Sequence, residues 1–167
     1  RVWRAPETDS AELERLCGSP DHQGIVAEVD PYPYGDAAGL LRREDALIVA
    51  LDQVQDPRNL GAVCRSAEFA GAAGVVVPAR RAAAVTAVTC KASAGAVEHL
   101  EVAHVRNLAD WLAEAKEAGF WVWGADAEAK AAPWGVDLKG PTVIVMGGEG
   151  KGLRPRVAKA CDGLIAL

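Results

Sequence analysis

Continuous apolar runs constrain the fold of this chain more than any other feature of its sequence. Residues 46–51 carry no polar side chain, and similar runs occur at 74–78 and 142–146. Runs without polar alternation are typical of strands that are covered on both faces. Helical patterns lie between them, which predicts an α/β fold, a parallel sheet with helices on both faces. The 167 residues suffice for one such core.

The remaining elements follow from periodicity and from capping residues. Further strands are expected at 22–29, 99–105, 120–124 and 163–167. Helices are expected at 10–16, 36–42, 60–70, 82–96, 108–118 and 154–160. Asp9 or Ser10 is a plausible cap for the first helix, and Asn59 and Asn107 can cap the helices that they precede.

The charge balance limits how the protein can interact with nucleic acid. The net charge is −5, so binding to RNA or DNA needs a local basic patch. Basic pairs occur at 42–43 and 80–81, and such pairs usually mark a solvated face. Arg154, Arg156 and Lys159 directly follow a Gly-rich stretch, where they could hold a polyanion.

Cysteine and histidine spacing gives no sign of a metal site. Cysteines occur at positions 17, 64, 90 and 161, too far apart for a zinc knuckle or a redox pair, and the three histidines are scattered. We expect free thiols in a reducing cytoplasm. No apolar run is long enough to cross a membrane, so neither a membrane nor a metal partner is expected.

Residues 52–66 form the first candidate site, between a predicted strand and a predicted helix. The carboxyl end of a strand is where α/β proteins usually bind ligands. Arg65 falls in a helix with an apolar face, where a guanidinium needs an anionic partner. A structural salt bridge to Glu68 or Asp52 and a contact to a phosphate are equally plausible at this point.

Residues 143–153 form the second candidate site, an apolar run that ends in four glycines within six residues. Glycine lets the backbone approach a ligand closely, because it has no Cβ atom. Lys151 is followed by Gly152 and not by Ser or Thr, so the stretch is no P-loop. A dinucleotide fingerprint belongs at the first strand, and this is the last full one. Glu149 is either a ligand-site carboxylate or a complement to the next helix.

The strand at 120–124 also ends in glycine, at Gly124-Ala125-Asp126. This turn either borders a small-molecule pocket or is an ordinary connection. No Ser-His-Asp arrangement and no nucleophile elbow occur in the sequence, which argues against a covalent hydrolase.

Taken together, these stretches resemble the SpoU (TrmH-like) family of RNA ribose 2′-O-methyltransferases, within the trefoil-knotted SPOUT class. Residues 52–68 are similar to the first family motif, and 143–153 with 162–167 are similar to the second motif and the start of the third. Residues 22–27 resemble the segment before the catalytic domain in ribosomal-RNA members.

The resemblance implies a knotted α/β domain, S-adenosylmethionine as cofactor, RNA as substrate and a homodimer. It implies that Arg65 helps to activate the ribose 2′-hydroxyl, that Asn59 orients the active-site loop and that Glu149 lies in the catalytic cleft. Gly147 and Leu167 would contact the methyl donor, and Gly124 and Ala125 would border its adenosine. Because arginine stays protonated, we favour an electrostatic and positioning role for Arg65.

The same resemblance suggests a division of the chain. Residues 1–30 would be the remnant of an N-terminal RNA-binding domain, 31–45 a linker, and 46–167 a SPOUT domain without its C-terminal end. The family's third motif continues beyond Leu167, so the knot is expected to be incomplete. The expected activity is methylation of 23S ribosomal RNA; the alternatives are a catalytically silent RNA-binding fragment of the same fold and, more weakly, an unrelated nucleotide-binding protein.

Overall fold

A computed structural model describes residues 5–166 of the chain. The chain divides into two compact units between Pro31 and Tyr32, and each unit is described by itself. The larger unit carries the sheet and both candidate motifs. The expected domain boundaries at 30 and 45 stay a prediction.

The smaller unit holds a single helix in its described part. Helix α1 (Ser10–Cys17) begins at Asp9, whose carboxylate accepts a hydrogen bond from Glu12 N, and it ends at Gly18 in the left-handed region. The strand expected at 22–29 is wrong, because these residues form turns and irregular backbone. Left-handed φ values of 53° at Gln23 and 84° at Gly24 break the extended path. Ile25 is 80% exposed, so its apolar character reflects no burial within the chain.

The larger unit is built on one parallel six-stranded sheet, as the apolar runs predict. Its order is β3-β2-β1-β5-β4-β6. The bounds are β1 (Leu47–Leu51), β2 (Gly74–Pro78), β3 (Glu101–Val105), β4 (Trp121–Ala125), β5 (Thr142–Met146) and β6 (Gly163–Ile165). Strand β1 pairs with β5 in the register Leu47↔Thr142 to Leu51↔Met146. The loop that follows β1 and the Gly-rich loop that follows β5 therefore begin side by side.

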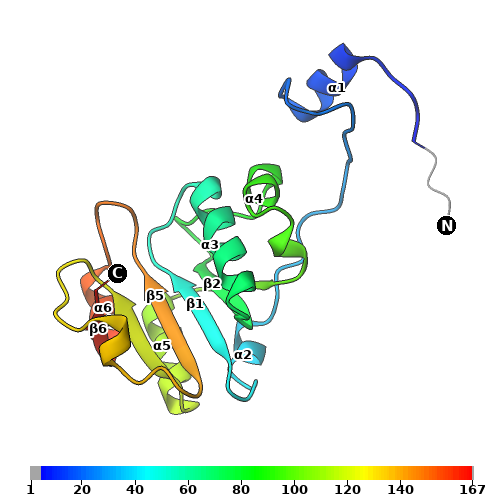
Figure 1. The fold of residues 1–167 in the computed structure, drawn as a ribbon. Helices are drawn as coiled ribbons and strands as arrows, with labels where there is room; N and C mark the ends of the chain where they lie inside the picture. The colour runs from blue at the N-terminus through cyan, green and yellow to red at the C-terminus, as the bar shows by residue number, and fades with distance from the viewer. Residues whose placement is uncertain (1–4, 167) are drawn as a thin grey trace. The chain divides into compact units, whose positions relative to one another are not determined.

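Helices cover both faces of this sheet (Figure 1). One face packs against α3 (Pro57–Phe69) and the 3₁₀ turn η1 (Ala96–Glu98), with α4 (Ala87–Ala92) packed on α3. The other face packs against α2 (Ala37–Leu40), α5 (Leu108–Glu117) and α6 (Pro155–Ala160). Leu60 of α3 and Leu112 of α5 are fully buried, one on each side. The 3₁₀ turn η2 (Pro133–Gly135) lies in the connection between β4 and β5.

Two helix predictions need correction. Asn59 does not cap α3: the helix begins earlier, at Pro57, and the Asp56 carboxylate accepts the hydrogen bond from Arg58 N. Proline suits the first position of a helix because it has no N–H to satisfy. The helix expected at 82–96 is shorter, because Thr86 and Thr89 form a capping box at the start of α4, and Ala94 and Gly95 take left-handed φ values.

Residues 32–35, at the start of the larger unit, are bonded to its sheet and to its connecting loops. The Tyr32 hydroxyl donates to Val97 O over 2.9 Å, and the Tyr34 hydroxyl accepts from Val85 N over 2.9 Å. Gly35 bridges to Ala103 of β3. Residues 32–35 therefore belong structurally to the sheet unit.

Candidate active site

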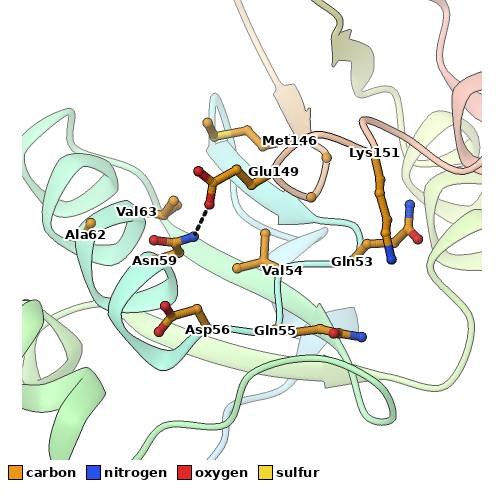
Figure 2. A pocket seen from close by; sticks show the side chains of 12 residues that line it. Gln53, Val54, Gln55, Asp56, Asn59, Ala62, Val63, Met146, Glu149 and Lys151 are labelled. Atoms are coloured by element: carbon orange, nitrogen blue, oxygen red, sulfur yellow. Dashed lines mark hydrogen bonds between the residues drawn. The ribbon is translucent and has the colours of Figure 1, made fainter.

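The two motifs meet at the carboxyl end of the sheet, around a cavity of about 500 Å³ (Figure 2). One wall comes from the loop after β1 and the first turns of α3, residues 53–63. The other wall comes from the end of β5 and the Gly-rich loop, residues 146–151. Because β1 and β5 are neighbours, the loops that leave them are brought together, as α/β sites require.

The Gly-rich loop folds back on itself directly after β5. Gly148 N donates to Gly152 O over 3.2 Å, and Gly152 N donates to Gly148 O over 2.9 Å. Gly150 and Gly152 have φ values of +70° and +61°, which glycine adopts without strain. A Cβ atom on Gly147 would overlap the backbone of Gly152. The glycines at these positions are therefore needed to close the loop, before any ligand is considered.

Asn59 and Glu149 join the two walls of the cavity. The Asn59 side-chain amide donates to the Glu149 carboxylate over 3.5 Å, and both residues are exposed at the rim (Figure 2). The contact places an amide and a carboxylate within reach of one ligand. An amide and a carboxylate can orient a hydroxyl group and accept its hydrogen bond.

A buried carboxylate holds the loop after β5 in place. Asp52 follows β1 and is fully buried. Its two oxygens accept hydrogen bonds from Arg154 N (2.7 Å) and Arg154 Nε (2.7 Å), and Arg154 Nη2 lies 2.6 Å from Oδ1. From the sequence, Asp52 is expected only as a possible partner for Arg65. A carboxylate that directly follows a buried strand is itself expected to be buried, and a buried carboxylate needs a partner; this feature of the sequence could have indicated the pair.

The loop after β1 is strained where it enters the cavity. Gln53 has a φ of 63°, which is uncommon for a residue other than glycine. Its side-chain amide donates to Gly152 O over 3.2 Å. Strained residues of this kind often cluster at functional sites.

Arg65 lies apart from these groups. It is exposed on α3, and it is not among the residues that line the cavity. Within the part of the chain that the structure describes, neither Glu68 nor Asp52 forms an ion pair with it, and Asp52 is bonded to Arg154 instead. A structural salt bridge from Arg65 to Glu68 or Asp52 is thus not formed among the described residues. The role of Arg65 stays a prediction.

The segments expected to bind the cofactor come together at the carboxyl ends of β4 and β6. Ala125 pairs with Ile165, and Asp126 N donates to Ile165 O over 2.9 Å. A Cβ atom on Gly124 would lie 2.7 Å from Leu164 and 2.8 Å from Leu153. A side chain at position 124 would therefore make the tips of both leucine side chains shift. Leu167 lies outside the described residues.

Two cysteines in the sheet unit have raised pKa values, Cys64 on the α3 side and Cys161 beside Gly124. Burial raises the pKa of Cys64 to about 11, and burial, assisted by the nearby Asp162 carboxylate, raises that of Cys161 to about 11. Thiolate is the nucleophilic form, so these thiols are poor nucleophiles at neutral pH. Among residues 5–166 no group of three His, Cys, Asp or Glu side chains could hold a metal ion. Over the same residues no helix is long and apolar enough to span a membrane.

Two known protein families match this chain. The family described as SpoU rRNA Methylase matches residues 46–167, most of the chain. The chain belongs to the SpoU rRNA methylase family. A second family, RNA 2′-O ribose methyltransferase substrate binding, matches residues 5–35.

Full-length relatives of this SpoU chain are considerably longer than it is. An uncharacterised tRNA/rRNA methyltransferase of Mycolicibacterium smegmatis is 44% identical over an alignment 172 positions long, gaps included. The alignment covers 99% of this chain and 54% of the relative. YacO of Bacillus subtilis, assigned to the TrmH family of tRNA/rRNA methyltransferases, is 44% identical over 87% of the chain and 61% of its own length. The chain thus spans little more than half of these relatives.

Solved structures share the fold. The SpoU methyltransferase AviRb from Streptomyces viridochromogenes, in complex with AdoMet, aligns with a TM-score of 0.72 at 28% identity over 81% of this chain and 53% of AviRb. AdoMet-bound rRNA methyltransferase from Sinorhizobium meliloti aligns with a TM-score of 0.71 at 28% identity, over 81% of this chain and 52% of its own. The predicted SPOUT-type parallel sheet is confirmed, and the knot stays a prediction.

Proposed function

We propose that this SpoU chain transfers a methyl group from S-adenosylmethionine to a ribose 2′-hydroxyl of RNA, with 23S ribosomal RNA as the substrate. The contact between Asn59 and Glu149 carries the proposal, because it joins the two family motifs at one cavity. The AdoMet complexes of AviRb and of the Sinorhizobium enzyme support the choice of methyl donor.

The residues around β4, β5 and β6 fit such a donor. Ala125, Leu153 and Leu164 are half-buried apolar residues near the carboxyl ends of these strands, a character that suits an adenine ring. In the proposal Gly124 and Ala125 border the adenosine, and the backbone of Gly147 and Leu167 contacts the donor.

In the proposed reaction a bond forms between the ribose O2′ and the methyl carbon, the sulfonium–carbon bond breaks with its electron pair going to sulfur, and the hydroxyl proton passes by way of the Glu149 carboxylate to water. Bound S-adenosylmethionine supplies the methyl group on a sulfonium that is ready for displacement. Glu149 accepts the hydrogen bond of the attacking hydroxyl, and Asn59 fixes its direction. Arg65 stays protonated and acts on charge and position, through the RNA backbone beside the target.

We further propose that the protein works as a homodimer through an apolar face of the sheet unit. A groove of about 300 Å³ is lined mainly by apolar residues of β1, α3 and β5, among them Val49, Val63 and Ile144. Phe69 on α3 is 91% exposed, and Trp121 on β4 is 55% exposed. Large exposed aromatic side chains are typical of interfaces between subunits.

A catalytically silent RNA-binding module is the second candidate. The position of Arg65 outside the cavity lining favours it. We also propose a cytoplasmic location, which the free state of Cys17, Cys64, Cys90 and Cys161 supports.

One experiment separates these functions. The protein is incubated with ribosomal RNA and S-adenosylmethionine that carries tritium in its methyl group, and the RNA is then hydrolysed with alkali. A 2′-O-methyl group blocks cleavage at its own nucleotide, so we expect the label in alkali-resistant dinucleotides. Label in mononucleotides would identify base methylation and refute the ribose assignment, and no label would favour the silent module. Arg65→Ala should abolish transfer, whereas Arg42→Ala, at the opposite edge of the sheet, should not.

A further inference from the structure

A second cavity, of about 390 Å³, opens at the same edge of the sheet and is lined by arginine side chains. It lies where β2 and β3 end and where α6 begins. Five arginines line it: Arg80, Arg81, Arg106, Arg154 and Arg156. No carboxylate is part of its lining. In a chain with a net charge of −5, this is a local reversal of sign.

Only two of these five charges have a carboxylate partner in the described structure. Arg154 is paired with Asp52, and Arg156 Nη2 lies 2.5 Å from Asp110 Oδ1. Within residues 5–166, no ion pair involves Arg80, Arg81 or Arg106, and all three are exposed. Clustered like charges repel each other, so an arrangement of this kind favours a bound anion.

The N-terminus of α5, which also borders this cavity, does not supply the positive charge. Asn107 caps α5 through its own side chain, which accepts from Ala109 N over 3.1 Å. The guanidinium groups are therefore the groups available to an anion. Each one can donate two parallel hydrogen bonds to a phosphate.

The arginine cavity adjoins the first cavity. The side-chain amide of Gln55, which lines the first cavity, donates to Arg81 O over 3.5 Å. Ala83 N donates to Val54 O over 2.8 Å, so the loop after β2 is bonded to the loop after β1. Arg81 is held there with a φ of 58°. A polyanion that enters the first cavity can therefore continue over this shared rim.

We propose that this arginine cavity binds the phosphodiester backbone of RNA next to the nucleotide whose ribose enters the first cavity. The inference rests on the proposed function for the choice of RNA as ligand, and it adds a site that holds the strand in register. Phosphate contacts of this kind position a nucleic acid without reading its sequence.

The test compares two double variants with the same loss of charge. Arg80→Gln with Arg106→Gln removes two unpaired arginines from the cavity. Arg42→Gln with Lys139→Gln removes two exposed charges that precede β1 and β5, at the other edge of the sheet. Binding of a fluorescein-labelled RNA oligonucleotide is followed by anisotropy between about 50 and about 200 mM salt.

We expect the cavity variant to bind RNA at least about tenfold more weakly than the wild type, and its salt slope to fall by about 1.4, or about 0.7 for each lost phosphate contact. The control variant should keep the slope of the wild type. Equal weakening in both variants, or in neither, would overturn the proposal. Arg80→Lys with Arg106→Lys keeps the charge and should keep the slope; loss equal to that of the glutamine variant would also overturn it.

Two further measurements separate this inference from the proposed function. S-adenosylmethionine binding, followed by calorimetry, should be the same in wild type and cavity variant; a loss there without a loss of RNA binding would assign the cavity to the carboxylate of the donor and refute the inference. Inorganic phosphate, at the phosphate concentration of the RNA, should not displace the oligonucleotide, and displacement would reduce the site to one for a free anion. If no methyl group is transferred but the cavity variant still binds RNA weakly, the proposed function fails and this inference stands.

Discussion

Arg154 surrounds the carboxylate of Asp52 with three nitrogen atoms, at 2.6 to 2.7 Å from its oxygens, although the two residues are 102 positions apart. Asp52 is fully buried, whereas the Arg154 side chain keeps 48% of its exposure. The pair therefore joins the end of β1 to the end of the Gly-rich loop, and the two partners differ in how well each tolerates the loss of the other.

That asymmetry gives the first prediction. Arg154→Met leaves a buried carboxylate without its ionic partner, so it should lower the free energy of unfolding by about 3 kcal/mol. Asp52→Asn leaves the half-exposed guanidinium to water and should cost about 1 to 2 kcal/mol. Urea unfolding of both variants measures the difference. Arg156→Met, which breaks an exposed pair, should change stability by less than about 1 kcal/mol; the reverse order of costs would contradict the assigned burial.

Two residues at the start of α3, three positions apart, are expected to have different roles: one caps the helix, and the other belongs to the proposed site. Asp56→Ala removes the helix cap and should lower stability by about 1 kcal/mol. Asn59→Ala removes an exposed amide that faces Glu149, so it should leave stability unchanged and lower methyl transfer at least about tenfold, which corresponds to about 1.4 kcal/mol of transition-state stabilisation. Thermal unfolding and initial rates measure the two effects. Unchanged transfer in Asn59→Ala would remove this residue from the site.

The closed Gly-rich loop predicts a steric effect. Gly147→Ala places a methyl group against the backbone of Gly152, which must move. We expect S-adenosylmethionine affinity to fall at least about tenfold, because the loop that we propose to border the donor changes shape. Gly135→Ala is the matched control, since nothing lies within 4 Å of its Cβ position. Wild-type affinity in Gly147→Ala, measured by calorimetry, would show that the donor does not contact this loop.

The raised thiol pKa values predict an order of alkylation. Ionisation of Cys64 and Cys161 requires pH values near their pKa of about 11, so at pH 8 only about one such thiol in a thousand is a thiolate. Cys17 is exposed and should react first. Mass spectrometry after brief treatment with iodoacetamide measures the order. Cys17→Ser should remove the fast site, and rapid labelling of Cys64 in the folded protein would contradict its burial.

The parallel sheet could be predicted because each buried strand corresponds to a short run of consecutive apolar residues in the sequence. Burial on both faces of β1 and β2 requires uninterrupted apolar residues, and the sequence shows them directly. The strand expected at 22–29 shows the limit of this reasoning. Ile25 and Val29 have the residue types of a strand, but both are 80% exposed, and no strand within residues 5–166 pairs with them.

The site was predictable only in its two halves. Residue patterns alone indicate Asn59 and Glu149 in separate motifs, and only the family resemblance implies one active site for both; their contact across 90 positions depends on the pairing of β1 with β5. The Asp52–Arg154 pair and the arginine cavity depend on the same long-range topology, so sequence spacing could not reveal them. The extent of α4 was missed for a local reason, since the left-handed backbone at Ala94 has no distinctive residue type.

The Gly-rich loop at the rim of the first cavity is held by hydrogen bonds along most of its length. Gly148 and Gly152 bond to each other, Gln53 bonds to Gly152, and Asp52 fixes Arg154 directly behind them. Glycine-rich loops usually sample many conformations, and a ligand that selects one of them loses affinity in proportion. Here the hydrogen bonds fix much of the loop backbone when the chain folds, so that part of its entropy is not lost again when a ligand binds.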